Sequence, residues 1–127
     1  MKNDNPLSPH IQIYNWHISS LVSISHRITG IINIIIITLI CFWLAFLLFG
    51  TKNYELIFNF FGTFIGKFLI VGSIWSFSFQ ALSEIRHLFW DLGFGFEIKT
   101  SNITGILVIF GSFILTIFFI LIKNSLL

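Results

Sequence analysis

Long uncharged apolar runs constrain this chain more than any motif in it. Residues 28–50 and 103–122 contain no charged side chain, and residues 68–83 form a third, shorter run behind Lys67. As a helix, the first run would be about 34 Å long, which is enough to cross a hydrocarbon core of about 30 Å. Only helices and closed barrels satisfy the backbone inside lipid, and three continuous runs cannot form a barrel. The sequence therefore predicts an all-α membrane protein with three transmembrane helices.

The whole chain is expected to be a single membrane-anchor domain. Its parts are a short polar N-terminal segment and three helices, at residues 1–20 and at about residues 21–50, 60–91 and 103–123. We expect a polar turn at residues 50–55, and a break in the helical pattern at residues 97–102 and the glycines before them. Residues 56–66 fit either an interfacial helix or an extension of the second span.

Charged residues are too few for a soluble domain of this length. Only 9% of the 127 residues are charged and 56% are hydrophobic, whereas a short soluble chain needs a polar surface. The net charge of +2 comes without a basic run, which argues against nucleic acid as a partner. Cys41 is the single cysteine, so the sequence offers neither a disulfide nor a cysteine-based metal site. We therefore expect the chain to lie in the lipid bilayer.

A narrow polar stripe marks the end of the second apolar region. Gln80, Glu84, His87 and Asp91 fall within about 60° of one another on a helix. Such a stripe is costly against lipid, so it faces a partner, a cofactor or a water-filled cavity. Simple helix–helix contacts are the structural alternative. Because three spans place the start of the first and the end of the second at one membrane face, the polar residues around both should meet there.

The start of the first helix offers a face suited to a flat, mostly apolar ligand. Trp16, Ser20, Ser23, Ile24 and Arg27 lie within about 100° of arc. A serine hydroxyl can donate to a carbonyl oxygen of such a ligand, and the guanidinium can stabilise negative charge that develops there. The structural alternative is that the serines bond to their own helix carbonyls and the arginine reaches lipid phosphates.

Three motifs in order carry a resemblance to a known family. Residues 8–14 (SPHIQIY), 23–30 (SISHRITG) and 85–93 (IRHLFWDLG) resemble the cytochrome b subunit of succinate dehydrogenase, the larger membrane anchor of respiratory complex II. The likeness runs from about residue 7 to Gly105, where the third helix opens in the family's manner. Length, number of spans and spacing between the motifs also fit this family.

The resemblance implies a place in the respiratory chain. Members of the family, with a second small membrane anchor, hold an iron–sulfur subunit and a flavoprotein subunit at the bilayer, and electrons pass from succinate to ubiquinone. Ser23 and Arg27 match quinone-site positions, with Trp16, Ser20 and Ile24 lining the pocket. The resemblance also implies that this chain alone is not catalytic.

Several alternatives share these features. A purely structural anchor with degenerate haem and quinone sites would keep the same three spans. A fumarate-reducing enzyme that uses a low-potential quinone has the same architecture. The expected location is the mitochondrial inner membrane, with the bacterial plasma membrane as the alternative.

The chain departs from the family at the position that should bind haem b. The family usually has an axial histidine seven residues before His87, where this chain has Gln80, and a glycine where it has Glu84. Because glutamine is not a usual haem ligand, we expect a degenerate pocket without haem. The alternatives are a ligand from a partner chain, or ligation by His87 or His26 after a change of register. If haem is present, His26, Arg27 and His87 would lie close to it.

Overall fold

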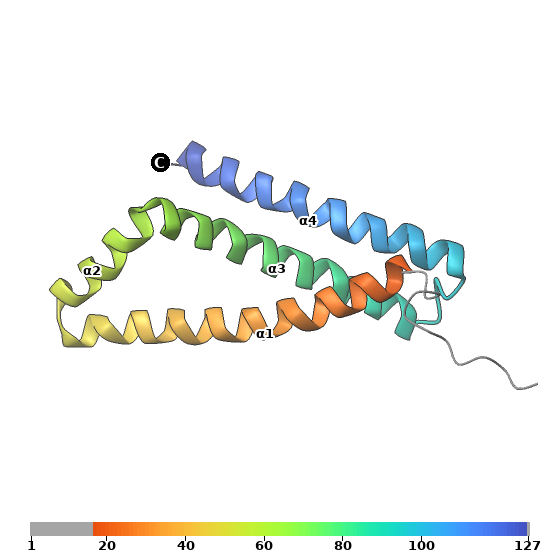
Figure 1. The fold of residues 1–127 in the computed structure, drawn as a ribbon, viewed down its shortest axis with the longest axis horizontal. Helices are drawn as coiled ribbons and strands as arrows, with labels where there is room; N and C mark the ends of the chain where they lie inside the picture. The colour runs from red at the N-terminus through yellow and green to blue at the C-terminus, as the bar shows by residue number, and fades with distance from the viewer. Residues whose placement is uncertain (1–16, 127) are drawn as a thin grey trace, which may run out of the picture.

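Three long helices and one short one make up the structure, a computed structural model that describes residues 17–126. In chain order these are α1 (Ile18–Ala45), a 3-10 turn η2 (Phe46–Phe49), α2 (Thr51–Gly62), α3 (Phe64–Asp91) and α4 (Ile98–Leu126) (Figure 1). Three of them, α1, α3 and α4, are long and apolar enough to cross a membrane. With 28 residues each, α1 and α3 are about 42 Å long, longer than a hydrocarbon core of about 30 Å. The predicted all-α fold with three spans is confirmed.

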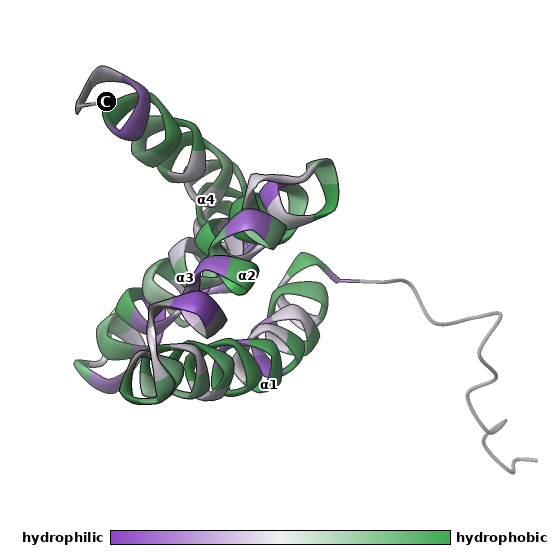
Figure 2. Cartoon of the chain, turned by 90° about the vertical axis from the view of Figure 1, so that its left-hand side faces the viewer, coloured by the Kyte–Doolittle hydropathy of each residue, from purple (hydrophilic) through white to green (hydrophobic). Residues whose placement is uncertain are grey.

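The middle span α3 lies between α1 and α4 and runs antiparallel to both (Figures 1 and 2). A small apolar core joins the three helices where they cross, formed by one side chain from each: Val22, Phe79 and Val108. Close approach of α4 to α1 depends on Gly105, because a Cβ there would meet Ile18 at 3.1 Å. The crossing therefore lies toward the end where α1 begins and α3 ends.

Most of the side chains buried between the helices are small and polar. Besides the apolar core, the buried residues of the described chain that carry polar or charged groups are Thr29, Asn33, Ser76, Ser78, Ser83, Arg86, Ser112 and Thr116. Large apolar side chains instead cover the outside, and long stretches of α1 and α4 are green in Figure 2. This distribution suits helices packed in lipid, where small residues allow close contact and polar groups bond across interfaces.

The connection between the first two spans differs from the expected polar turn. Residues 51–55 are the first turns of α2, which stacks Tyr54 on Trp43 of α1 with 5.0 Å between ring centroids. Aromatic packing against α1 thus keeps this polar stretch helical. Thr63 then caps α3, with its Oγ1 accepting from Gly66 N over 3.2 Å. Because Thr63 is extended, α2 is a separate helix that turns sharply from α3 and is not its extension, and this turn needs Gly66, where a Cβ would collide with the Phe60 carbonyl oxygen.

The expected break at residues 97–102 is also wrong in part. Helix α4 begins at Ile98, and Ser101 N donates to Glu97 O over 2.8 Å in its first turn. The early start is stabilised by Arg86 of α3, which bonds to Ser101. The break between α3 and α4 is therefore limited to the short loop before Ile98, with positive φ at Gly93 and Gly95.

Candidate functional site: a polar end shared by three helices

The start of α1, the end of α3 and the start of α4 lie together at one end of the molecule (Figure 1). His26 on α1 and Glu84 on α3 connect two of these helices, with 2.9 Å between His26 Nε2 and Glu84 Oε1. For the described residues from 17 onward, the expectation that the two polar clusters meet is confirmed.

Gln80 links α3 to α1 through both atoms of its amide. Thr29 Oγ1 donates to Gln80 Oε1 over 2.9 Å, and Gln80 Nε2 lies 2.8 Å from His26 Nε2. A Cβ on Gly30 would come 3.7 Å from the Gln80 amide, so the side chain packs closely against the α1 backbone. The amide of Gln80 is therefore engaged in helix–helix contacts.

His87 continues the stripe, and Asp91 does not join it. His87 Nδ1 donates to the Ser83 carbonyl oxygen over 2.8 Å, and its ring centroid lies 5.0 Å from that of His26. The ligand-type atoms of His26, Glu84 and His87 all lie within 4.8 Å of one another. Asp91 is exposed at the end of α3 and is not a member of this group.

A deeper polar contact, which the sequence reasoning missed, lies one turn further into the membrane. Ser76 Oγ donates to Asn33 Oδ1 over 2.7 Å, and both residues are buried between α1 and α3. Within the described part of the chain, Asn33 Nδ2 has no partner. The signal was present, because an asparagine in the middle of an isoleucine-rich span has to face protein rather than lipid.

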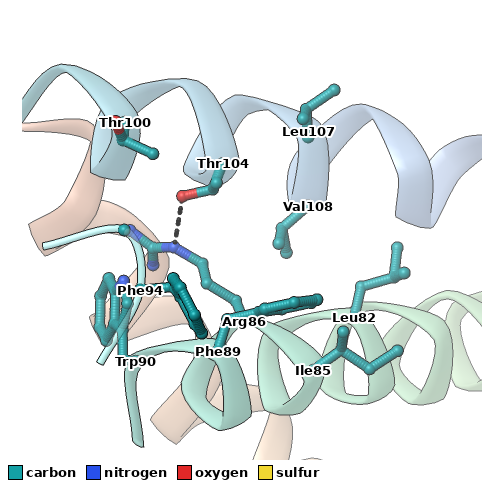
Figure 3. Close-up of a pocket in the computed structure, with 11 residues that line it drawn as sticks. Leu82, Ile85, Arg86, Phe89, Trp90, Phe94, Thr100, Thr104, Leu107 and Val108 are labelled. Atoms are coloured by element: carbon teal, nitrogen blue, oxygen red, sulfur yellow. Dashed lines mark hydrogen bonds between the residues drawn. The ribbon is translucent and has the colours of Figure 1, made fainter. Parts of the chain in front are cut away.

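Arg86 is the second residue whose role the sequence did not reveal. Its side chain crosses from α3 to α4 (Figure 3), where Nε donates to Thr104 Oγ1 over 3.1 Å. Nη2 donates to both the carbonyl oxygen and the Oγ of Ser101 over 2.9 Å, and the guanidinium lies 4.2 Å from the centre of the Trp90 ring. Only 5% of the residue is exposed, so this cation is held by neutral oxygens and an aromatic face.

An apolar groove of about 410 Å³ opens beside Arg86 between α3 and α4. Its aliphatic wall comes from Leu82 and Ile85 on α3 and from Leu107 and Val108 on α4, and Figure 3 shows Leu82 and Val108 pointing toward each other. The guanidinium turns toward Thr104 and away from this wall, so its hydrogen bonds fasten the two helices together.

The predicted quinone face lies on the outside of α1. Ser23, Ile24 and Arg27 are exposed, and Ser20 is partly buried. They sit about 100° to 200° around the helix from Val22, which packs into the core. Trp16, the fifth residue predicted for this face, lies outside the described residues. The chain therefore presents these groups outward, and a second protein surface would be needed to enclose a ligand there.

Comparison with known proteins assigns the chain. Residues 1–119 match the family of succinate dehydrogenase/fumarate reductase transmembrane subunits. The chain belongs to this family. It is a multi-pass membrane subunit of a succinate dehydrogenase or fumarate reductase, as the three motifs predicted.

Similarity to individual family members extends over nearly the whole chain. The succinate dehydrogenase cytochrome b556 subunit of Rickettsia felis is 39% identical over 90% of this chain and 89% of its own length. The subunit with the same name from Paracoccus denitrificans is 31% identical over 91% and 89%. The cytochrome b560 subunit of Marchantia polymorpha is 34% identical over 87% and 84%.

The names of these relatives denote b-type cytochromes, which makes the residues around Gln80 a test of the cofactor. Gln80 offers iron an amide in place of an imidazole, and Thr29 and His26 already engage that amide. Glu84 adds a carboxylate one turn further along the same face. The donors at this position therefore do not fit axial ligation of haem, and the two imidazoles nearby belong to His26 and His87.

Proposed function

We propose that this family member is the membrane-anchor subunit of a succinate:ubiquinone oxidoreductase and contributes to its ubiquinone-reduction site. The observation that supports this role is the exposed face of α1, where Ser23 and Arg27 present a hydroxyl and a fixed cation outward. In this proposal the chain works with a second small membrane anchor, an iron–sulfur subunit and a flavoprotein subunit, and is not catalytic alone.

The chemistry follows from the two side chains. Ser23 and Arg27 are one helical turn apart, about 6 Å along α1, a distance comparable with the span of a quinone ring. The Ser23 hydroxyl donates to one carbonyl oxygen and orients the ring. The Arg27 guanidinium stabilises the negative charge that grows on oxygen as electrons arrive from the iron–sulfur subunit. Ile24 supplies an apolar contact between them.

Substitution in the intact complex tests this role. We expect Arg27→Ala to lower succinate–quinone turnover by about 100-fold and Ser23→Ala by about tenfold, since each removes a group that stabilises the reacting oxygen. Succinate oxidation with an artificial dye that bypasses the quinone should be unchanged. Lys123→Ala, which removes an exposed cation in the last turn of α4, serves as the matched control.

If turnover with quinone survives in both variants, the chain is a purely structural anchor. The engaged amide of Gln80 gives this alternative its support, because a subunit that has lost one site can have lost both. We further propose that no haem b is bound at position 80, and that the polar contacts of Gln80 and Glu84 replace it. In this proposal the quinone and the partner subunits determine whether the complex oxidises succinate or reduces fumarate.

We propose that the complex lies in the mitochondrial inner membrane or, as the alternative, in a bacterial plasma membrane. The relative from Marchantia polymorpha is compatible with the first location. The higher identity of 39% to the Rickettsia felis subunit favours the second. Fractionation of cells that express the native complex, followed by detection of the chain, would distinguish them.

A further inference from the structure

We propose that His26, Glu84 and His87 form a binding site for a divalent transition-metal ion between α1 and α3. The three side chains come from two helices, and Glu84 and His87 are three residues apart, which places them side by side on α3. Their ligand-type atoms already lie within 4.8 Å of one another. This site is separate from the outward quinone face of α1 and does not depend on it.

The distances are close to those of a metal site. Two ligands on a tetrahedral zinc ion, each about 2.1 Å from the metal, lie about 3.4 Å apart. His26 Nε2 and Glu84 Oε1 are 2.9 Å apart, so only the third group has to approach. The Glu84 side chain is 57% exposed and the His26 side chain 21% exposed, which leaves the carboxylate room to adjust.

A backbone carbonyl orients the imidazole of His87. Because His87 Nδ1 donates its proton to the Ser83 carbonyl oxygen over 2.8 Å, the lone pair of a neutral ring is on Nε2. A carbonyl or carboxylate that fixes the ring in this way is the usual support of a metal-binding histidine. Gln80 Nε2 lies 2.8 Å from His26 Nε2, so the Gln80 amide has to turn aside when this ring nitrogen binds the ion.

The electrostatic setting favours a cation. Glu84 lies seven residues before the end of α3, or about 10 Å along the helix, on the polar stripe near this end of the span. An uncompensated anion in a membrane-spanning helix is costly, and the exposed carboxylate of Glu84 remains accessible to an ion. A divalent ion on one carboxylate and two neutral imidazoles would provide the compensating charge.

The donor set selects the class of metal. Two imidazole nitrogens and one carboxylate oxygen suit zinc and other divalent first-row ions, whereas calcium and magnesium prefer oxygen ligands. Three protein ligands leave one tetrahedral position for water or another ligand. A bound ion would also fasten the start of α1 to the end of α3.

Equilibrium dialysis of the purified complex against Zn²⁺, followed by elemental analysis, tests the site. We expect one zinc ion per complex that is lost or bound about 10- to 100-fold more weakly in Glu84→Gln and in His87→Gln. Asp91→Asn is the matched control, because this exposed carboxylate on the same helix lies outside the cluster and its loss should leave zinc binding unchanged. Equal binding in all four proteins, or no zinc on the unmodified complex, would overturn the proposal.

Zinc-edge X-ray absorption on the unmodified complex keeps the test decisive if a variant does not assemble. The expected spectrum shows imidazole nitrogen and carboxylate oxygen ligands, whereas sulfur ligands or oxygen alone would contradict the site. Failure of the quinone proposal would be visible separately, as unchanged turnover in Arg27→Ala with zinc binding intact.

Discussion

Helix α3 carries two polar arrangements near the same end, one facing α4 and one facing α1, and they are built differently. Arg86 is almost fully buried and all its observed partners are neutral groups of α4 and one aromatic ring. On the side of α1, Glu84 is largely exposed and lies beside two imidazoles. A buried charge with several hydrogen bonds fastens helices, whereas an accessible carboxylate among imidazoles can still exchange a proton or bind an ion.

The largest effect on stability is therefore expected on the α4 side. Arg86→Met keeps an unbranched apolar chain but removes the hydrogen bonds to Ser101 and Thr104, and we expect a loss of about 3 kcal/mol. Thermal unfolding of the detergent-solubilised complex, or of its membrane subunits, measures this loss as a lower transition midpoint. Lys99→Met, at an exposed cation in the first turn of α4, should change the midpoint little. If Arg86→Met unfolded at the same midpoint as Lys99→Met, Arg86 would not hold α3 to α4 more strongly than an exposed cation does.

A smaller loss is expected on the α1 side. Gln80→Leu removes the contacts with Thr29 and His26, yet Thr29 Oγ1 is also within bonding distance of the Ser25 and His26 carbonyl oxygens of its own helix. Since no buried donor loses its only partner, we expect a cost of about 1 kcal/mol in the same unfolding measurement. Ser73→Ala, which affects only a bond to the carbonyl of Leu69 in the same helix, is the control. If Gln80→Leu lost as much stability as Arg86→Met, the contacts of α3 with α1 and with α4 would stabilise the protein equally.

The last prediction concerns haem b, which we expect to be absent from the complex. Because Gln80 places an engaged amide where the family resemblance implies a haem ligand, the pyridine haemochrome spectrum of the purified complex should contain no stoichiometric b-type haem. A stoichiometric b-type signal would contradict the haem-free proposal. It would then assign the iron to a partner-chain histidine or to one of the two imidazoles near Glu84.

The sequence predicted correctly those features that the lipid bilayer constrains. The three spans followed from uncharged runs, because the backbone has no other way to cross hydrocarbon. The polar turn at residues 50–55 was wrong because Tyr54 packs on Trp43, a contact that local composition does not encode. The first turn of α4 was missed for a related reason, since Arg86 stabilises it from another helix.

For the candidate sites too, some features were visible in the sequence and others only in the structure. Motifs and helical spacing brought Ser23 and Arg27 onto one face, and the quinone role of that face stays a prediction. The replacement at Gln80 was visible in the sequence, but the partners of its amide were not. Asn33 and Ser76 are 43 residues apart and meet only because α1 crosses α3.

By itself, then, the sequence determined the membrane class, the number of spans, the family and the unusual residue at position 80. These properties depend on composition, period and local motif, all of which can be read along one chain. The tertiary structure decided which side of α3 each polar group faces. Glu84 meets His26 and His87, and Arg86, only two residues further along, meets α4 instead. That choice depends on the crossing of three helices around Val22 and Gly105, which no single segment specifies.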